Sequence, residues 1–289
     1  MTKNILYVWA SDYAENSGEG NLARLFTKYL IKRKNYKIKF NKINNIKYNK
    51  YLSPFIGILY CWKYYFVNKN VAYINYLPLW NFFIFMFLPP KTILGPITGG
   101  AKYSSRHKLN FLIRKYLFTL FYKISECFIL LRSSEIIFST DLLKEKLSKK
   151  LKQKSKFNFL IKNIRISKFK NKKRSIDLIL YYRKHMNKES FFPKKFIRRM
   201  AKSGAKISVI GDKLNIKNIK NYGYLKNINV QRLQAQSKFT IASGENIYSI
   251  FTVECLLYNV KVLIEKKRYS QINFFKKNFL VTNFDKINL

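Results

Sequence analysis

Residues 176–182 read IDLILYY, an unbroken, mostly apolar run that is typical of a strand buried on both faces of a parallel sheet. The next segment, 183–188, reads RKHMNK and is polar and basic. A helix is predicted over 193–203, with Pro193 at a tolerated first position, and a second strand over 206–210. This order of strand, basic loop and helix predicts an α/β unit whose loop lies at the carboxyl end of the first strand.

The same alternation extends in both directions from this unit. Downstream, we predict helices at 230–236 and 249–258 and strands at 239–242 and 260–264. Upstream, we predict strands at 5–10, 36–40, 71–75, 92–95, 135–139 and 157–161 and helices at 20–33, 53–67 and 106–132. A basic segment near 163–175 lacks a sustained apolar period and is predicted to be a linker. The fold class is therefore α/β, with an N-terminal domain over 1–170 and a C-terminal domain over 171–289.

Length and cysteine content restrict the protein class. A chain of 289 residues is long enough for two domains with cores of their own. The three cysteines are far apart and form no CxxC pair, and there are only two histidines. We therefore expect neither a disulfide framework nor a metal site, and a reducing cytoplasm is the compartment that fits best.

The charge is strongly positive, with 57 Lys and Arg against 14 Asp and Glu. Three explanations stay open. The cations could bind nucleic acid, because they release counterions from phosphates. They could bind an anionic membrane surface. An A/T-rich genome would also enrich Lys, Asn, Ile, Phe and Tyr without selection for binding. In each case the field attracts anionic substrates.

No targeting segment stands out. The apolar run at 5–10 is too short for a signal sequence, and the run at 76–90 is interrupted by Asn81 and closed by two prolines. Residues 106–132 predict an amphipathic helix with a basic face. Such a helix packs on a core or lies peripherally on the inner face of a membrane, and both alternatives stay open.

Two glycine-containing loops follow predicted strands of the first half. Asn16–Asn21 precedes a helix, whose first N–H groups could bind an anion, but it does not match the GxGxxG dinucleotide motif. Gly95–Gly100 holds three glycines directly after a strand, which lets a ligand approach the backbone. A plain turn is the alternative for each loop.

Two loops of the second half carry charged side chains. The segment 183–188 combines three cations with His185, a set that suits a diphosphate. Ser243–Asn246 contains Glu245, nine positions before Glu254, in a chain where carboxylates are scarce. Carboxylates can accept hydrogen bonds from sugar or ribose hydroxyls. For Glu245, an acidic residue favoured at a helix start is the alternative.

The order of these features resembles the donor domain of GT-B glycosyltransferases, glycosyltransferase family 4 in particular. The matching segments are Arg183 with Lys188 five positions later, Val209–Asp212, Tyr222–Leu225, Leu233–Lys238 and Thr252–Val262. They cover residues 176–265, and Gly95–Gly100 resembles the GPxGGG segment of some such transferases.

The resemblance implies two Rossmann-like domains facing each other across a cleft, with an acceptor-side first domain and a nucleotide-sugar donor-binding second domain. It implies a retaining, metal-independent hexosyltransferase without a cofactor, since the nucleotide-sugar is a substrate. Arg183 and Lys188 would bind the diphosphate, and together with Glu245 they are the predicted catalytic residues. The predicted donor-binding residues are Gly18, Gly20, Arg183, His185, Lys188, Gly211, Glu245, Asn246 and Glu254. The predicted acceptor-side residues are Glu19, Asn21, Thr98, Gly99 and Gly100.

The expected partners are a nucleotide-sugar donor and a glycan or lipid-linked acceptor, as in cell-surface polysaccharide synthesis. Two alternatives stay open. A basic nucleic-acid-binding protein would use interleaved cations and aromatics, although no RNP, KH or helix-turn-helix pattern is present. A transferase-like fold without activity is the other.

Overall fold

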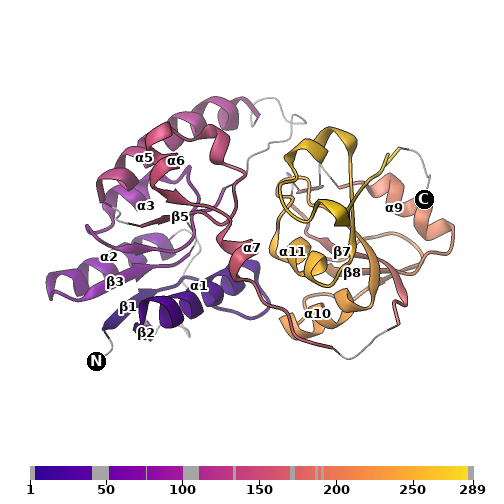
Figure 1. Cartoon of the computed structure of the whole chain (residues 1–289), viewed down its shortest axis with the longest axis horizontal. Helices are drawn as coiled ribbons and strands as arrows, with labels where there is room; N and C mark the ends of the chain where they lie inside the picture. The colour runs from indigo at the N-terminus through magenta and orange to yellow at the C-terminus, as the bar shows by residue number, and fades with distance from the viewer. Residues whose placement is uncertain are drawn as a thin grey trace. The chain divides into compact units, whose positions relative to one another are not determined.

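A computed structural model describes residues 4–40, 52–75, 77–99, 111–132, 135–169, 173–185, 188–189 and 192–285. These residues form two compact units, the first ending at Asn163 and the second beginning at Ile164 (Figure 1). Both units are built from helices and parallel strands, so the predicted α/β class is confirmed.

Unit 1 contains a parallel sheet of strand order β2-β1-β3-β4. Its strands are β1 (Ile5–Trp9), β2 (Lys37–Phe40), β3 (Asn70–Tyr73) and β4 (Ile93–Leu94). Four of its helices are α1 (Gly18–Lys34), α2 (Ser53–Phe66), α3 (Phe82–Phe87) and α5 (Phe118–Arg132), the last preceded by a π-helical turn, η1 (Ile113–Leu117). A bridge between Ile97 and Phe138 connects the β4 segment to a short pair, β5 (Ile136–Ile137) and β6 (Ser155–Lys156). The remaining short helices are η2 (Lys144–Lys146), α6 (Lys149–Lys154) and α7 (Phe159–Asn163).

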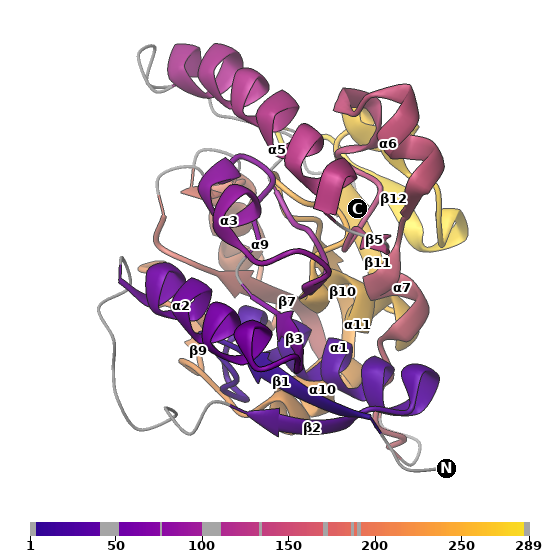
Figure 2. The ribbon, with the colours of Figure 1, turned by 90° about the vertical axis from the view of Figure 1, so that its left-hand side faces the viewer.

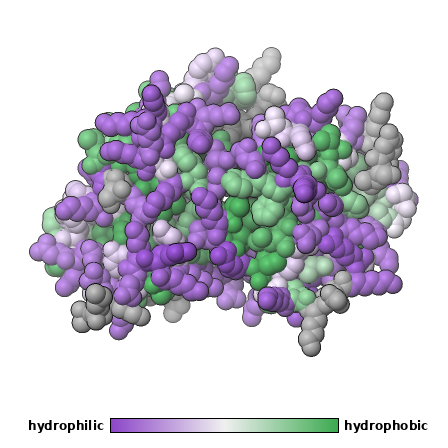
Figure 3. All heavy atoms as spheres, viewed as in Figure 1, coloured by the Kyte–Doolittle hydropathy of each residue, from purple (hydrophilic) through white to green (hydrophobic). Residues whose placement is uncertain are grey.

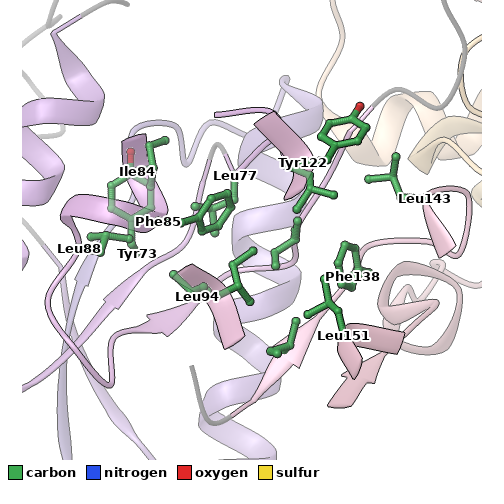
Figure 4. Close-up of a cluster of buried hydrophobic side chains, with 14 of the residues drawn as sticks. Tyr73, Leu77, Ile84, Phe85, Leu88, Leu94, Tyr122, Phe138, Leu143 and Leu151 are labelled. Atoms are coloured by element: carbon green, nitrogen blue, oxygen red, sulfur yellow. The ribbon is translucent and has the colours of Figure 1, made fainter. Parts of the chain in front are cut away.

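The first helix shows why the sequence folds in this way. The Ser17 hydroxyl accepts a hydrogen bond from the Gly20 N–H at 2.8 Å and caps the helix start. Asn35 ends the helix in a left-handed conformation, with φ of 52°. Elsewhere in unit 1, aromatic and aliphatic side chains from strands and helices fill one core, including Tyr73, Phe85 and Tyr122 (Figure 4).

Unit 2 contains a six-stranded parallel sheet of order β12-β11-β10-β7-β8-β9. Its strands are β7 (Ile176–Tyr182), β8 (Ile207–Gly211), β9 (Ile219–Asn221), β10 (Ser237–Ile241), β11 (Lys261–Ile264) and β12 (Phe279–Val281). Its helices are α9 (Lys194–Lys202), α10 (Asn227–Ala235) and α11 (Ile250–Leu257), with short 3₁₀ turns η3 (Lys266–Gln271) and η4 (Lys276–Asn278). Numbered along the unit, the order is 3-2-1-4-5-6, the doubly wound arrangement of a Rossmann fold.

One predicted strand is wrong. Residues 157–161 were expected to be extended, but Phe159–Asn163 forms helix α7. Asn158 takes a left-handed φ of 60°, which turns the chain, and Phe159 then packs edge-on against Phe26 of α1 at 5.3 Å. Helices α3 and α6 and strands β6, β9 and β12 were not predicted. In the described part of the chain, no helix is both long and apolar enough to cross a bilayer.

Candidate functional site

The carboxyl edge of the unit 2 sheet holds most of the predicted donor residues. Strands β7 and β10 are parallel neighbours, with Ile179 opposite Thr240. The strand order reverses between them, and their loops leave the sheet in different directions. In open α/β sheets, ligands bind in the crevice at such a switch point. The segment beginning at Arg183 and the segment Ser243–Asn246 therefore lie on either side of the point where a ligand is expected.

The loop after β7 is held in place by Asp212, a residue that was not predicted as part of the site. Its carboxylate accepts hydrogen bonds from the Lys184 N–H at 2.6 Å and from the Tyr224 hydroxyl at 2.7 Å. The Tyr224 bond, then that of Lys184, lowers the pKa of Asp212. The same bond raises the pKa of Tyr224 to about 12. Asp212 thus fixes the backbone next to Arg183, and the scarcity of carboxylates was the signal in the sequence that could have identified it.

The cations of this loop differ in exposure. Arg183, Lys184 and His185 are exposed, and the Arg183 guanidinium makes no hydrogen bond or ion pair with the described residues. Lys188 is half-buried in a helical turn that the Glu189 N–H closes onto the His185 carbonyl at 2.9 Å.

Glu189 anchors the other end of the loop. Its carboxylate accepts hydrogen bonds from the Tyr182 hydroxyl and from the Lys194 ammonium, the latter at 2.9 Å. These bonds, that of Tyr182 first, lower the pKa of Glu189. The loop is therefore tied both to the end of β7 and to the start of α9.

Gly211, at the end of β8, has a structural reason to be glycine. Its φ is 96°, and a Cβ at this position would lie 2.3 Å from the Tyr182 carbonyl oxygen. The close approach of β8 to the end of β7 depends on this glycine. The predicted contact of Gly211 with a donor stays a prediction.

The loop after β10 leads into the N-terminus of α11. Ser249 caps this helix, and its hydroxyl accepts a hydrogen bond from the Thr252 N–H at 3.2 Å. Asn246 closes a turn by accepting the Tyr248 N–H at 3.0 Å, and Glu245 is half-buried beside it. The first N–H groups of a helix carry a partial positive charge and favour an anion. The sheet edge therefore offers a cationic loop and a helix start next to the same switch point.

Glu254 is placed differently from the other candidates. Its side chain is 3% exposed on α11, and the carboxylate accepts bonds from Asn227 at 2.8 Å, Gln231 at 3.0 Å and Gln234 at 3.3 Å. Burial raises the pKa of this carboxyl, and the three amide donors offset part of the shift. Glu254 therefore joins α11 to α10, and its predicted contact with a ribose stays a prediction.

The candidates of unit 1 form a separate group at the carboxyl edge of that unit's own sheet. Gly18 and Gly20 lie in the first turn of α1, and a Cβ on Gly20 would lie 2.2 Å from the Ala14 carbonyl oxygen. Gly20 is thus required for packing. Glu19 is half-buried in the same turn, and Asn21 accepts a hydrogen bond from Arg24 at 2.6 Å.

The second group of unit 1 is part of its framework. Thr98 bridges to Pro78, and its N–H donates to the Leu77 carbonyl at 2.9 Å. A Cβ added to Gly99 would lie 2.9 Å from Cδ1 of Leu143. Gly100 lies outside the described residues. Within the described ranges, His, Cys, Asp and Glu side chains form no group of three that could hold a metal ion.

The fold has clear relatives among solved structures. It matches a structure described as a UDP-N-acetylglucosamine 2-epimerase from Listeria monocytogenes with a TM-score of 0.52 and 11% identity, over 96% of this chain and 86% of that one. It matches S. aureus MnaA with UDP at a TM-score of 0.51 and 14% identity, over 93% and 81% of the two chains. It matches the spinosyn forosaminyltransferase SpnP at 0.50 and 8% identity, over 99% and 87%.

No protein-family model and no curated protein sequence matches the chain. At these identities the similarity establishes the fold, and the fold is of the GT-B type, with two Rossmann-like domains. The predicted GT-B class is confirmed, whereas membership of glycosyltransferase family 4 stays a prediction.

Proposed function

We propose that this protein is a glycosyltransferase that moves a sugar from a nucleotide-diphosphate donor to a glycan or lipid-linked acceptor in cell-surface polysaccharide synthesis. The observation that supports it most is the switch point of unit 2, where the Arg183 loop and the capped start of α11 leave neighbouring strands. The structures with similar folds include a named sugar transferase and one solved with UDP, which supports a nucleotide-sugar as the ligand.

The chemistry follows from the charge that develops during transfer. When the bond between the sugar and the diphosphate breaks, negative charge accumulates on the departing phosphate oxygens. Cations that are already oriented there stabilise the transition state more than the ground state. In the proposal, Arg183 binds the diphosphate through two N–H groups, Lys188 adds a second positive charge, and Glu245 faces the sugar. The reaction would then proceed without a metal ion and with retention at the anomeric carbon.

The protein would act in the cytoplasm, associated peripherally with the inner face of the membrane where a lipid-linked acceptor is presented. Nucleic acid is not a partner in this proposal, and the positive field of the chain instead attracts the anionic donor.

The test is a panel of UDP-, GDP- and ADP-sugars with thermal unfolding as the readout. A donor present at about 100 times its Kd stabilises the protein by about 2.7 kcal/mol. Arg183→Ala should remove a charge-assisted contact and weaken donor binding by about 10- to 100-fold. Lys202→Ala, which removes an exposed cation at the end of α9, is the matched control and should respond as the wild type does.

Three outcomes would contradict the proposal. If no nucleotide stabilises the protein while RNA binds tightly, the chain is a nucleic-acid-binding protein. If Arg183→Ala responds like the wild type, the diphosphate site lies elsewhere. If a nucleotide-sugar is converted to its epimer without an acceptor, the chain is an epimerase.

A further inference from the structure

The helix that spans 111–132 is apolar on both of its sides. On one side, Tyr122 and Ile129 are buried in the core of unit 1. At 100° per residue, the opposite side carries Leu117, Leu120 and Leu131, which are 44%, 52% and 75% exposed. A surface helix normally turns charged residues to solvent, so an apolar outer side indicates a partner.

Two neighbouring helices continue this exposed apolar surface. Leu59 and Phe66 of α2 are 68% and 73% exposed. Phe83 and Phe87 of α3 are 50% and 48% exposed, with their rings parallel and 6.4 Å apart.

The three helices lie side by side. The Trp62 indole N–H of α2 donates a hydrogen bond to the Phe87 carbonyl oxygen of α3 at 2.7 Å. The rings of Phe82 in α3 and Phe121 in α5 pack with their centroids 5.1 Å apart. Figure 2 shows α5, α3 and α2 next to one another along one side of unit 1, and Figure 3 shows hydrophobic residues among polar ones at the surface of this unit. We call this surface the α2–α3–α5 face.

The three helices of the α2–α3–α5 face carry no exposed acidic side chain. The sequence contains no Asp or Glu between Glu19 and Glu126. Glu126 itself is buried, with its carboxylate accepting the Ser148 N–H at 3.0 Å. Exposed Lys115 and Lys123 are interspersed along the helix, and the Lys115 ammonium lies 5.2 Å from the centre of the Tyr116 ring.

We propose that the α2–α3–α5 face binds the surface of a lipid bilayer that carries anionic headgroups. Leucine and aromatic side chains would enter the boundary of the acyl region, and the lysines would contact the headgroups. A second copy of this chain fits less well, because each copy carries a net charge of +43 and the faces would repel. The proposal rests on the peripheral membrane association in the proposed function and names the face responsible for it, and it does not depend on the donor site.

The test is flotation of the protein with phosphatidylcholine vesicles, with and without phosphatidylglycerol, at low and high salt. The wild type should bind the anionic vesicles and lose binding as salt rises. The double variant Leu117→Gln/Leu120→Gln should bind at least about tenfold more weakly. Ile31→Gln is the matched control, because Ile31 is 44% exposed on α1, outside the face, and this variant should bind like the wild type.

A second pair of variants tests the charges. Lys115→Gln/Lys123→Gln should weaken binding by roughly fivefold for each cation removed. Lys28→Gln/Lys32→Gln, on the exposed side of α1, removes the same charge and should have a smaller effect.

Several results would overturn the inference. Equal binding to neutral and anionic vesicles would show that anionic headgroups do not contribute to binding. Equal loss in the α5 and α1 variants shows that net charge, and not this face, is responsible. A dimer seen by analytical ultracentrifugation that Leu117→Gln/Leu120→Gln dissociates, without vesicle binding, makes the face an interface between copies. Circular dichroism must show the variants folded, and their nucleotide-sugar response without vesicles separates this test from that of the proposed function.

Discussion

Replacing Glu254 separates its structural role from the predicted ribose contact. In Glu254→Ala, the half-buried amide of Asn227 and the buried amides of Gln231 and Gln234 each lose a hydrogen-bond acceptor. A buried donor left without its acceptor costs about 1–3 kcal/mol. Relief of the carboxylate's own burial offsets part of this, so we expect a loss of about 2–4 kcal/mol in the free energy of unfolding.

Glu254→Gln keeps the shape of the side chain and one acceptor oxygen. It should keep the bonds from Asn227 and Gln231 and lose the longer one from Gln234, which costs about 1 kcal/mol. Urea unfolding measures both variants. Glu265→Ala is the control. It removes a surface ion pair with Lys267 at 3.1 Å, worth about 0–1 kcal/mol, together with the favourable charge of Glu265 near Arg268.

A Glu254→Ala protein as stable as the Glu265→Ala control would refute the reasoning. The ribose contact is tested on the folded Glu254→Gln protein. If that protein loses stabilisation by nucleotide-sugars at nearly unchanged stability, the carboxylate contacts the ligand. If it responds like the wild type, Glu254 serves only to join α10 and α11.

The remaining predictions concern the same sheet edge. Gly211→Ala should destabilise unit 2 by at least about 1–3 kcal/mol, because φ is 96° and the new Cβ would meet the Tyr182 carbonyl, and an unchanged urea midpoint would contradict this. Asp212→Ala frees the Lys184 N–H and should weaken nucleotide-sugar binding with little loss of overall stability, whereas Asp212→Asn, which keeps an acceptor, should recover much of the binding. Because burial raises the pKa of Glu254, its contribution to folding is complete below the ordinary value of 4.5 and declines as pH rises through the raised value. The wild type should therefore gain stability relative to Glu254→Gln as pH falls, and a difference that is independent of pH would show that this pKa is not raised.

The elements predicted best from the sequence are those whose own residues carry a complete pattern. Strand β7 matches its predicted range because its apolar run is bounded by basic residues on both sides. Strand β9 was missed because Ile219-Lys220-Asn221 has no apolar run and is defined only by pairing with β8. Helix α7 was assigned as a strand because five residues are too few to separate the two periods, and contact with α1 decides the conformation.

The residues of the candidate site also differ in whether their own stretch of sequence is enough to identify them. The basic loop after β7 was identified because charge and position are local properties. The role of Asp212 depends on Lys184, 28 residues earlier in the chain, and on Tyr224, 12 residues later, so no local window contains it. The burial of Glu254 likewise depends on amides that only the packing of α10 brings to it.

Helix α11 connects the sheet edge with the core over only eight residues. Its capped start borders the switch point, and Glu254 in its middle attaches it to the amides of α10. A ligand held at the start of α11 would raise the free energy of every local opening of that helix. Because side chains of α10 donate hydrogen bonds to Glu254 of α11, local opening of α10 is coupled to local opening of α11. Slower amide hydrogen exchange in α10 would then report a nucleotide that makes no contact with α10 at all.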